Sequence, residues 1–155
     1  MAAALKYLVL HCTATQEGRE VTSAQIRAWH TDPVSKGGRG WKQVGYTDMI
    51  HRDGTIERLV DNNEDAVVDT WEITNGASGI NSVSRHVVYV GGVAKDGKTP
   101  KDTRTPEQLI AMKHYVKDFH RRFPKVKIIG HNEVAAKACP SFDVGKWLKE
   151  IGINQ

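Results

Sequence analysis

Three short apolar segments constrain the fold of this chain more than any other feature. They are Leu5–Leu10, His86–Val90 and Val126–Gly130, and all three are rich in Val, Leu and Ile. Such short runs are typical of strands that are buried on both faces of a sheet. Segments with helical signals lie between and after them, and strands that alternate with helices predict an α/β fold. We therefore expect a single domain whose central mixed β-sheet is flanked by helices.

The helices are predicted from their first residues. Thr22 can cap a helix with Gln25 three residues on, and Thr105 precedes Pro106 and Gln108 in the same capping-box pattern. Asp143 can cap a last helix. From these caps the helices should continue to about His30, Phe123 and Gly152.

Turn residues define the connections. Tyr46–Ile50 and Thr55–Val60 flank Asp53-Gly54, which predicts an antiparallel hairpin because Asp-Gly accepts the positive φ of a tight turn. The turn explains this Asp-Gly pair, so we assign it no catalytic role. Asp61–Ser82 shows neither helical nor strand periodicity and is expected to be a long loop, and long loops are often functional. Gly91–Arg104 is expected to be a second loop.

Composition limits the cellular setting. The 155 residues carry a net charge of +4 without a nucleic-acid-binding signature, so no nucleic-acid partner is expected. No segment approaches the roughly 20 apolar residues of a membrane helix, and the opening Met-Ala-Ala-Ala-Leu-Lys lacks the layout of a signal peptide. We expect no membrane partner, a monomer that is cytoplasmic as synthesised, and two reduced cysteines.

Three residues could form a metal site at one rim of the sheet. His11 and His131 each follow an apolar strand, and Cys139 lies eight residues after His131 beside a proline. Two imidazoles and one thiolate leave zinc a fourth position for water, which is typical of catalytic sites. Spacing alone favours the simpler alternative of two packed histidines and a buried cysteine. The adjacent Cys12 should point to the opposite face and belong to the core.

Longer blocks resemble a known family. The blocks are His11-Cys12-Thr13-Ala14-Thr15, Val44-Gly45-Tyr46, His51-Arg52-Asp53-Gly54-Thr55-Ile56 and the stretch from Gly130 to Asp143 that ends Lys137-Ala138-Cys139-Pro140-Ser141-Phe142-Asp143. They resemble the N-acetylmuramoyl-L-alanine amidases of the type-2, peptidoglycan-recognition-protein family, in that family's order from about Leu5 to Leu148. The resemblance implies that residues 1–155 form one zinc amidase domain, with one catalytic Zn²⁺ bound by His11, His131 and Cys139. It places Tyr46 and Lys137 where the family has its two catalytic side chains.

The implied activity is hydrolysis of the amide between N-acetylmuramic acid and the L-alanine of the stem peptide. The resemblance points to a phage or prophage endolysin that acts on the cell wall after release, with peptidoglycan as its partner. Two alternatives stay open: a peptidoglycan-recognition module that binds without cutting, and a thiol hydrolase that uses Cys139 with His131.

The match weakens between Thr70 and Val90. The family often has a histidine before this strand and a glycine where His86 stands, so substrate preference is the property most affected. Trp71, Asn75 and Asn81 are candidate substrate contacts in this segment. The other histidines are interpreted as packing or surface residues: His30, His51, His86, His114 and His120.

Overall fold

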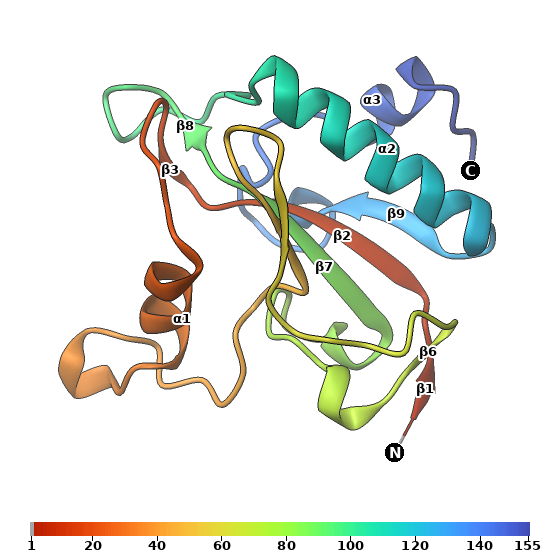
Figure 1. The fold of residues 1–155 in the computed structure, drawn as a ribbon, viewed down its shortest axis with the longest axis horizontal. Helices are drawn as coiled ribbons and strands as arrows, with labels where there is room; N and C mark the ends of the chain where they lie inside the picture. The colour runs from red at the N-terminus through yellow and green to blue at the C-terminus, as the bar shows by residue number, and fades with distance from the viewer. Residues whose placement is uncertain (1) are drawn as a thin grey trace.

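The computed structural model describes residues 2–155, and its centre is a five-stranded sheet (Figure 1). The strands lie in the order β5-β4-β7-β2-β9. Their bounds are β2 Tyr7–Cys12, β4 Asp48–Ile50, β5 Ile56–Arg58, β7 Ser84–Tyr89 and β9 Lys127–Gly130. β4, β7, β2 and β9 run parallel to one another, whereas β5 pairs with β4 in antiparallel fashion. The predicted mixed sheet is confirmed.

Three α-helices begin where the capping residues indicate. They are α1 Ser23–Thr31, α2 Pro106–Arg122 and α3 Val144–Glu150. Thr22 and Thr105 each form a complete capping box, and the Asp143 side chain accepts the Lys146 N–H at 3.0 Å. Each cap satisfies an amide that the first helical turn leaves without a partner.

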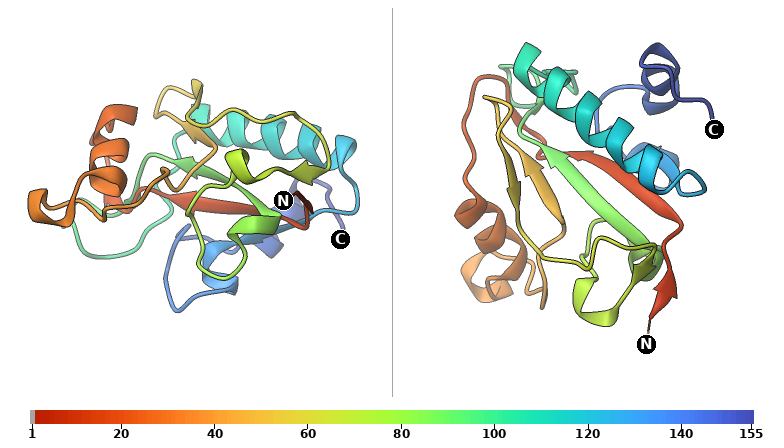
Figure 2. Two further views of the ribbon diagram at one scale, coloured as in Figure 1. Left: turned by 90° about the horizontal axis from the view of Figure 1, so that it is seen from below. Right: turned by 45° about the vertical axis from the view of Figure 1, so that its right-hand side comes forward.

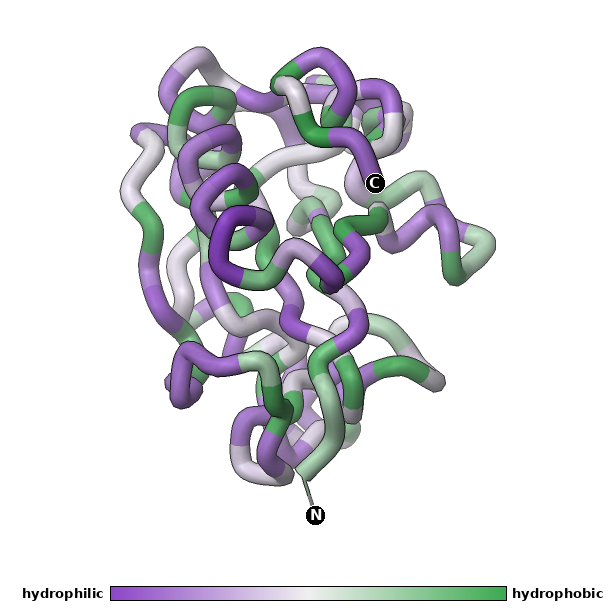
Figure 3. Tube along the Cα trace, turned by 90° about the vertical axis from the view of Figure 1, so that its right-hand side faces the viewer, coloured by the Kyte–Doolittle hydropathy of each residue, from purple (hydrophilic) through white to green (hydrophobic). Residues whose placement is uncertain are grey.

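The two faces of the sheet are covered differently (Figure 2). α2 and α3 pack on one face, over Leu8, Leu10 and Cys12 of β2. On the other face Ile26 of α1 packs in a smaller cluster around Met49 and Val88. Hydrophobic and hydrophilic stretches alternate along the chain (Figure 3). Residues of β2 that point away from α2 therefore face α1 and the loops around it.

The region 61–82 is more ordered than its composition predicts. It contains β6 (Val67–Val68), which pairs with β1 (Ala3–Ala4), and the short 3-10 turns η2 (Thr70–Glu72) and η3 (Asn81–Val83). The buried Glu72 carboxylate accepts the backbone N–H groups of Asn63 and Asp69, at 2.6 and 2.7 Å. The expectation of a loop without secondary structure was wrong here, because side-chain to backbone hydrogen bonds hold the segment without any periodic pattern.

Two strand boundaries also differ from expectation. β2 continues through Cys12, so His11 lies inside the strand. β4 begins at Asp48, which leaves Tyr46 in the segment before it. The hairpin turn is confirmed, since Gly54 has a φ of +88° and the Thr55 N–H donates to the Asp53 carboxylate at 2.9 Å.

The remaining short elements complete the described chain. β3 (Thr15–Gln16) pairs in parallel with β8 (Gly92–Val93), and two more 3-10 turns are η1 (Val34–Lys36) and η4 (His131–Glu133). Within residues 2–155, no helix has the length and apolar character needed to cross a membrane.

Candidate active site

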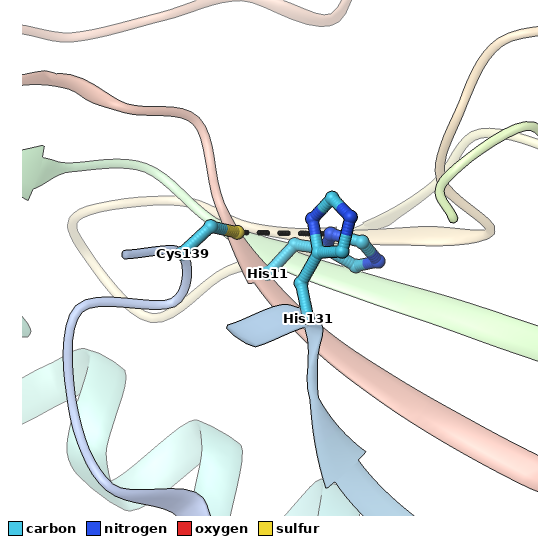
Figure 4. Close-up of side chains that lie close together, drawn as sticks. All are labelled: His11, His131 and Cys139. Atoms are coloured by element: carbon cyan, nitrogen blue, oxygen red, sulfur yellow. Dashed lines mark hydrogen bonds between the residues drawn. The ribbon is translucent and has the colours of Figure 1, made fainter. Parts of the chain in front are cut away.

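The sheet register brings His11 and His131 together. β2 and β9 are parallel, and Leu10 pairs with Gly130, so His11 is the next residue on β2 and His131 the first residue after β9. In a parallel pair, side chains at matching positions point to the same face. The centroids of the two imidazole rings are accordingly 4.7 Å apart. Figure 4 shows the two rings close together, with Cys139 beside them.

Cys139 reaches the same place through a loop tied back to both strands. The Asn132 N–H donates to the Cys139 carbonyl oxygen at 2.8 Å, which closes the loop that begins at His131. The Cys12 N–H lies 3.2 Å from Cys139 Sγ and can donate to it. The structure thus brings together the three residues that the sequence indicated, with one ligand atom from each within 4.8 Å of the others.

The three donors fit a tetrahedral zinc ion. Cys139 Sγ lies 3.7 Å from His11 Nδ1. Sulfur and nitrogen ligands at their usual zinc distances, about 2.3 and 2.0 Å, are about 3.5 Å apart in a tetrahedron. Among the described residues this is the one group of three or more His, Cys, Asp and Glu side chains with such spacing.

The protonation of the site also suits a metal. Burial, followed by the neighbouring His86, holds the pKa of His11 well below its usual value. Burial and then Lys137 lower the pKa of His131. Both rings are therefore neutral near pH 7, the state in which imidazole binds a metal. The Cys12 thiol and then burial raise the pKa of Cys139, so its thiol needs a bound cation to ionise.

Cys12 belongs to the core, as strand alternation predicts. Its side chain is 4% exposed and packs in the cluster under α2 and α3, with its Sγ 3.8 Å from Ser141 Oγ. The backbone of Cys12 also contacts a candidate ligand, because its N–H lies 3.2 Å and its carbonyl oxygen 3.8 Å from Cys139 Sγ.

A groove of about 510 Å³ opens beside the three donors. Its walls come from the segment after α1, from residues 75–81 and from the loop between His131 and Cys139. Side chains that line it include His30, Arg39, Trp41, Tyr46, Asn75, Asn81, His131 and Lys137.

The two side chains with expected catalytic roles both line this groove. The Tyr46 ring lies 5.1 Å from the His11 ring and 5.2 Å from the His30 ring. Burial, and then Cys139, raise the pKa of Tyr46, so its hydroxyl stays protonated and can donate. Lys137 lies exposed on the loop between two of the donors.

The three candidate substrate contacts occupy different positions. Asn75 and Asn81 line the groove, but the Asn75 amide donates to the Gln43 carbonyl oxygen at 2.8 Å, and Asn81 Oδ1 accepts the Ala77 N–H at 2.9 Å. Trp71 is 53% exposed in η2, and it is not among the residues that line the groove.

Sequence reasoning missed two histidines at the site. His30 contacts Trp41 and Tyr46 and accepts the Gly45 N–H at 2.9 Å. His86 Nδ1 lies 2.8 Å from His11 Nε2. The sequence held no local signal for this contact, because it depends on the pairing of Val88 with His11, which places His86 two residues away on the same face of the sheet. His51, by contrast, pairs with Glu57 at 2.8 Å.

Comparison with known proteins agrees with this geometry. The family model described as N-acetylmuramoyl-L-alanine amidase matches residues 1–142. The chain is 38% identical to the endolysin of Enterobacteria phage K11 over 140 residues, which is 90% of this chain and 83% of that protein. It is 34% identical to the endolysin of Escherichia phage T7 over 143 residues, or 92% and 85%.

A solved structure shows the same fold. The Ph2119 endolysin from the Thermus scotoductus MAT2119 bacteriophage Ph2119 superimposes with a TM-score of 0.71 at 24% identity, over 98% of this chain and 87% of that one. The family match and the two phage relatives together establish that this chain belongs to the N-acetylmuramoyl-L-alanine amidase family.

Proposed function

We propose that the chain, residues 1–155, acts as one zinc-dependent amidase domain on peptidoglycan. The bond cleaved is the amide between the lactyl group of N-acetylmuramic acid and the L-alanine of the stem peptide. The observation that carries this proposal is the set of two neutral imidazoles and one thiol beside a groove that Tyr46 and Lys137 also line. Family membership supports the choice of bond.

His11, His131 and Cys139 would hold the zinc ion and leave one position open. When bound, zinc supplies an activated water and polarises the scissile carbonyl. The rigid part of the site is the sheet rim, which fixes two ligands through the backbone ladder between β2 and β9. A substrate carbonyl placed in the groove would therefore meet ligands that do not need to rearrange.

Lys137 and Tyr46 supply the remaining polar groups. The Lys137 ammonium can donate a hydrogen bond to the oxygen that becomes negative as the amide carbonyl is attacked. The Tyr46 hydroxyl, which stays protonated, can orient the attacking water or assist proton transfer to the leaving amine. Such donors each contribute about 10²- to 10³-fold in rate.

The groove walls should contact the sugar and the peptide. Asn75 and Asn81 keep polar atoms at the wall beyond those used in their own hydrogen bonds. Trp71 is proposed as a contact only for a substrate that extends past the groove, because it lies outside it. The similarity to phage endolysins supports action on the cell wall after release from the cell.

The thiol-hydrolase alternative needs a Cys139 thiolate without a metal. The raised pKa of Cys139 disfavours that state, because the neighbouring Cys12 thiol and burial both oppose its ionisation. The recognition-only alternative leaves Tyr46 and Lys137 without a chemical role.

The test is release of new L-alanine amino termini and intact glycan from purified peptidoglycan. We expect release by the native protein, loss after verified removal of zinc, and recovery on adding zinc. Activity that survives metal removal but is lost on thiol alkylation would favour the thiol hydrolase. Binding of peptidoglycan by fully zinc-loaded protein with no amide cleavage would favour the recognition module.

A further inference from the structure

His86 is completely buried and is hydrogen-bonded at both ring nitrogens. Its Nδ1 lies 2.8 Å from His11 Nε2, and its Nε2 lies 3.0 Å from Asn81 Oδ1. The three side chains form a line that starts at the groove wall and ends at the candidate metal ligand His11. A buried polar chain of this kind must satisfy every donor and acceptor within itself.

The role of Asn81 Oδ1 determines which atom donates in each of these hydrogen bonds. Asn81 Oδ1 also accepts the Ala77 N–H at 2.9 Å, so this atom is the carbonyl oxygen and cannot donate. His86 Nε2 must then carry the hydrogen and donate to it. In a neutral ring this leaves His86 Nδ1 with a lone pair, which accepts from His11 Nε2–H. His11 Nδ1 therefore keeps its own lone pair, and this is the atom 3.7 Å from Cys139 Sγ.

The surrounding fold is shaped to hold the His86 ring. On β7, His86 stands two residues before Val88, the residue that pairs with His11, so the two rings share one face of the sheet. Gly76 leaves the space for the ring, since a Cβ at that position would lie 2.5 Å from His86 Nδ1. The His86 backbone is held by Thr47, just before β4, whose N–H donates to the His86 carbonyl oxygen at 2.8 Å.

We propose that His86, supported by Asn81, is a positioning residue for the metal ligand His11. It holds His11 in the tautomer with hydrogen on Nε2 and aims Nδ1 at the cation. The proposal rests on the metal site of the proposed function, but not on the bond that is cleaved. The family that this chain resembles often has glycine at the position of His86. The hydrogen bond between His86 and His11 is therefore a feature of this chain and not of the family pattern.

The consequence is measurable as zinc affinity. Outer partners that fix the tautomer of a ligand histidine typically change metal affinity by about 10- to 100-fold. His86→Leu introduces an apolar side chain of moderate size and removes the acceptor for His11 Nε2–H. His86→Asn can return an acceptor oxygen close to the place of Nδ1. His114→Asn, on the exposed face of α2, is the matched control.

Two measurements test the proposal in the absence of peptidoglycan. Long-range proton–nitrogen NMR of the histidine rings in zinc-free wild-type protein should show His11 with hydrogen on Nε2. Zinc competition titrations should show affinity about 10- to 100-fold weaker for His86→Leu, largely restored in His86→Asn, and unchanged in His114→Asn.

The proposal is overturned if wild-type His11 carries hydrogen on Nδ1, or if folded His86→Leu binds zinc within about twofold of wild type. The tautomer measurement needs no variant, so it decides even where His86→Leu fails to fold. If the protein binds zinc and shows the expected His11 tautomer but cleaves no amide, the proposed function is contradicted and this inference is not.

Discussion

The metal rim and the groove wall are built in different ways. At the rim, His11 and His131 follow paired residues of two parallel strands, and backbone ladder hydrogen bonds fix their spacing. At the wall, residues 75–81 are held by single side chains: the Asn75 amide donates to the Gln43 carbonyl oxygen at 2.8 Å, and Asn81 Oδ1 accepts the Ala77 N–H at 2.9 Å. A ladder fixes position through repeated bonds, whereas a wall of this kind depends on individual residues. We expect changes at the rim to abolish activity and changes on the wall to tune it.

The largest effect should come from the thiol that completes the rim. Cys139→Ser should weaken zinc binding by more than about 100-fold, because it removes a direct zinc ligand. Loss of a residue that only hydrogen-bonds a ligand typically costs about 10- to 100-fold. Amidase activity should fall with zinc content. His114→Asn, at an exposed position on α2, is the control, since it lies outside the site. Equal zinc loss in both variants, measured by metal analysis of the purified proteins, would contradict the assignment of Cys139.

A smaller effect is expected from the two polar groups that line the groove. Tyr46→Phe and Lys137→Met should each lower kcat by about 10²- to 10³-fold, because each removes a donor that acts on the reacting groups. Zinc stoichiometry should stay at the wild-type level, since neither residue is among the candidate ligands. Steady-state kinetics with metal analysis separates this result from that for Cys139→Ser. A variant with wild-type kcat would remove that residue from the catalytic set.

The smallest effect concerns stability against pH near the rim. Burial, and then Arg39, lower the pKa of His30 to about 4. The pKa of this histidine in the unfolded chain is near 6.5. Between pH 6.5 and about pH 4, the unfolded chain therefore binds a proton at His30 that the folded protein does not bind. The contribution of His30 is therefore fully present above pH 6.5 and is lost as pH falls toward 4, at up to about 1.4 kcal/mol per pH unit.

Urea unfolding of zinc-free protein at pH 7 and pH 5 measures this effect. The fall in unfolding free energy should be smaller for His30→Gln than for wild type by roughly 2 kcal/mol. His114→Gln, at an exposed position on α2, should match wild type. An identical pH dependence in all three proteins would show that the buried imidazole does not resist protonation.

The same difference in construction explains what could be predicted from the sequence. The caps at Thr22, Thr105 and Asp143 act within one turn, so local pattern was sufficient. The two strands that position His11 and His131 could also be predicted, because short apolar runs mark buried strands, although β2 continues through Cys12. The roles of Tyr46 and Lys137 came from family resemblance, and they remain proposals.

The contact between His11 and His86 was beyond the reach of local pattern. It depends on the pairing of Val9 with His86 between strands that are far apart in the chain, and on the empty space at Gly76. Neither the strand pairing nor the space at Gly76 can be recognised from His86 alone, so the sequence favoured a packing histidine at this position. The order in residues 61–82 was missed for a related reason, because Glu72 reaches amides on both sides of β6 without any repeating pattern.

A zinc titration of the metal-free protein most directly tests whether the rim is a catalytic metal site. Bound zinc and amidase activity would be measured on the same samples as zinc is added. We expect both to rise together and to reach a plateau at one zinc ion per chain, with no activity in the metal-free protein. Full activity before any zinc is bound, or one bound zinc without a gain in activity, would contradict a catalytic site at His11, His131 and Cys139.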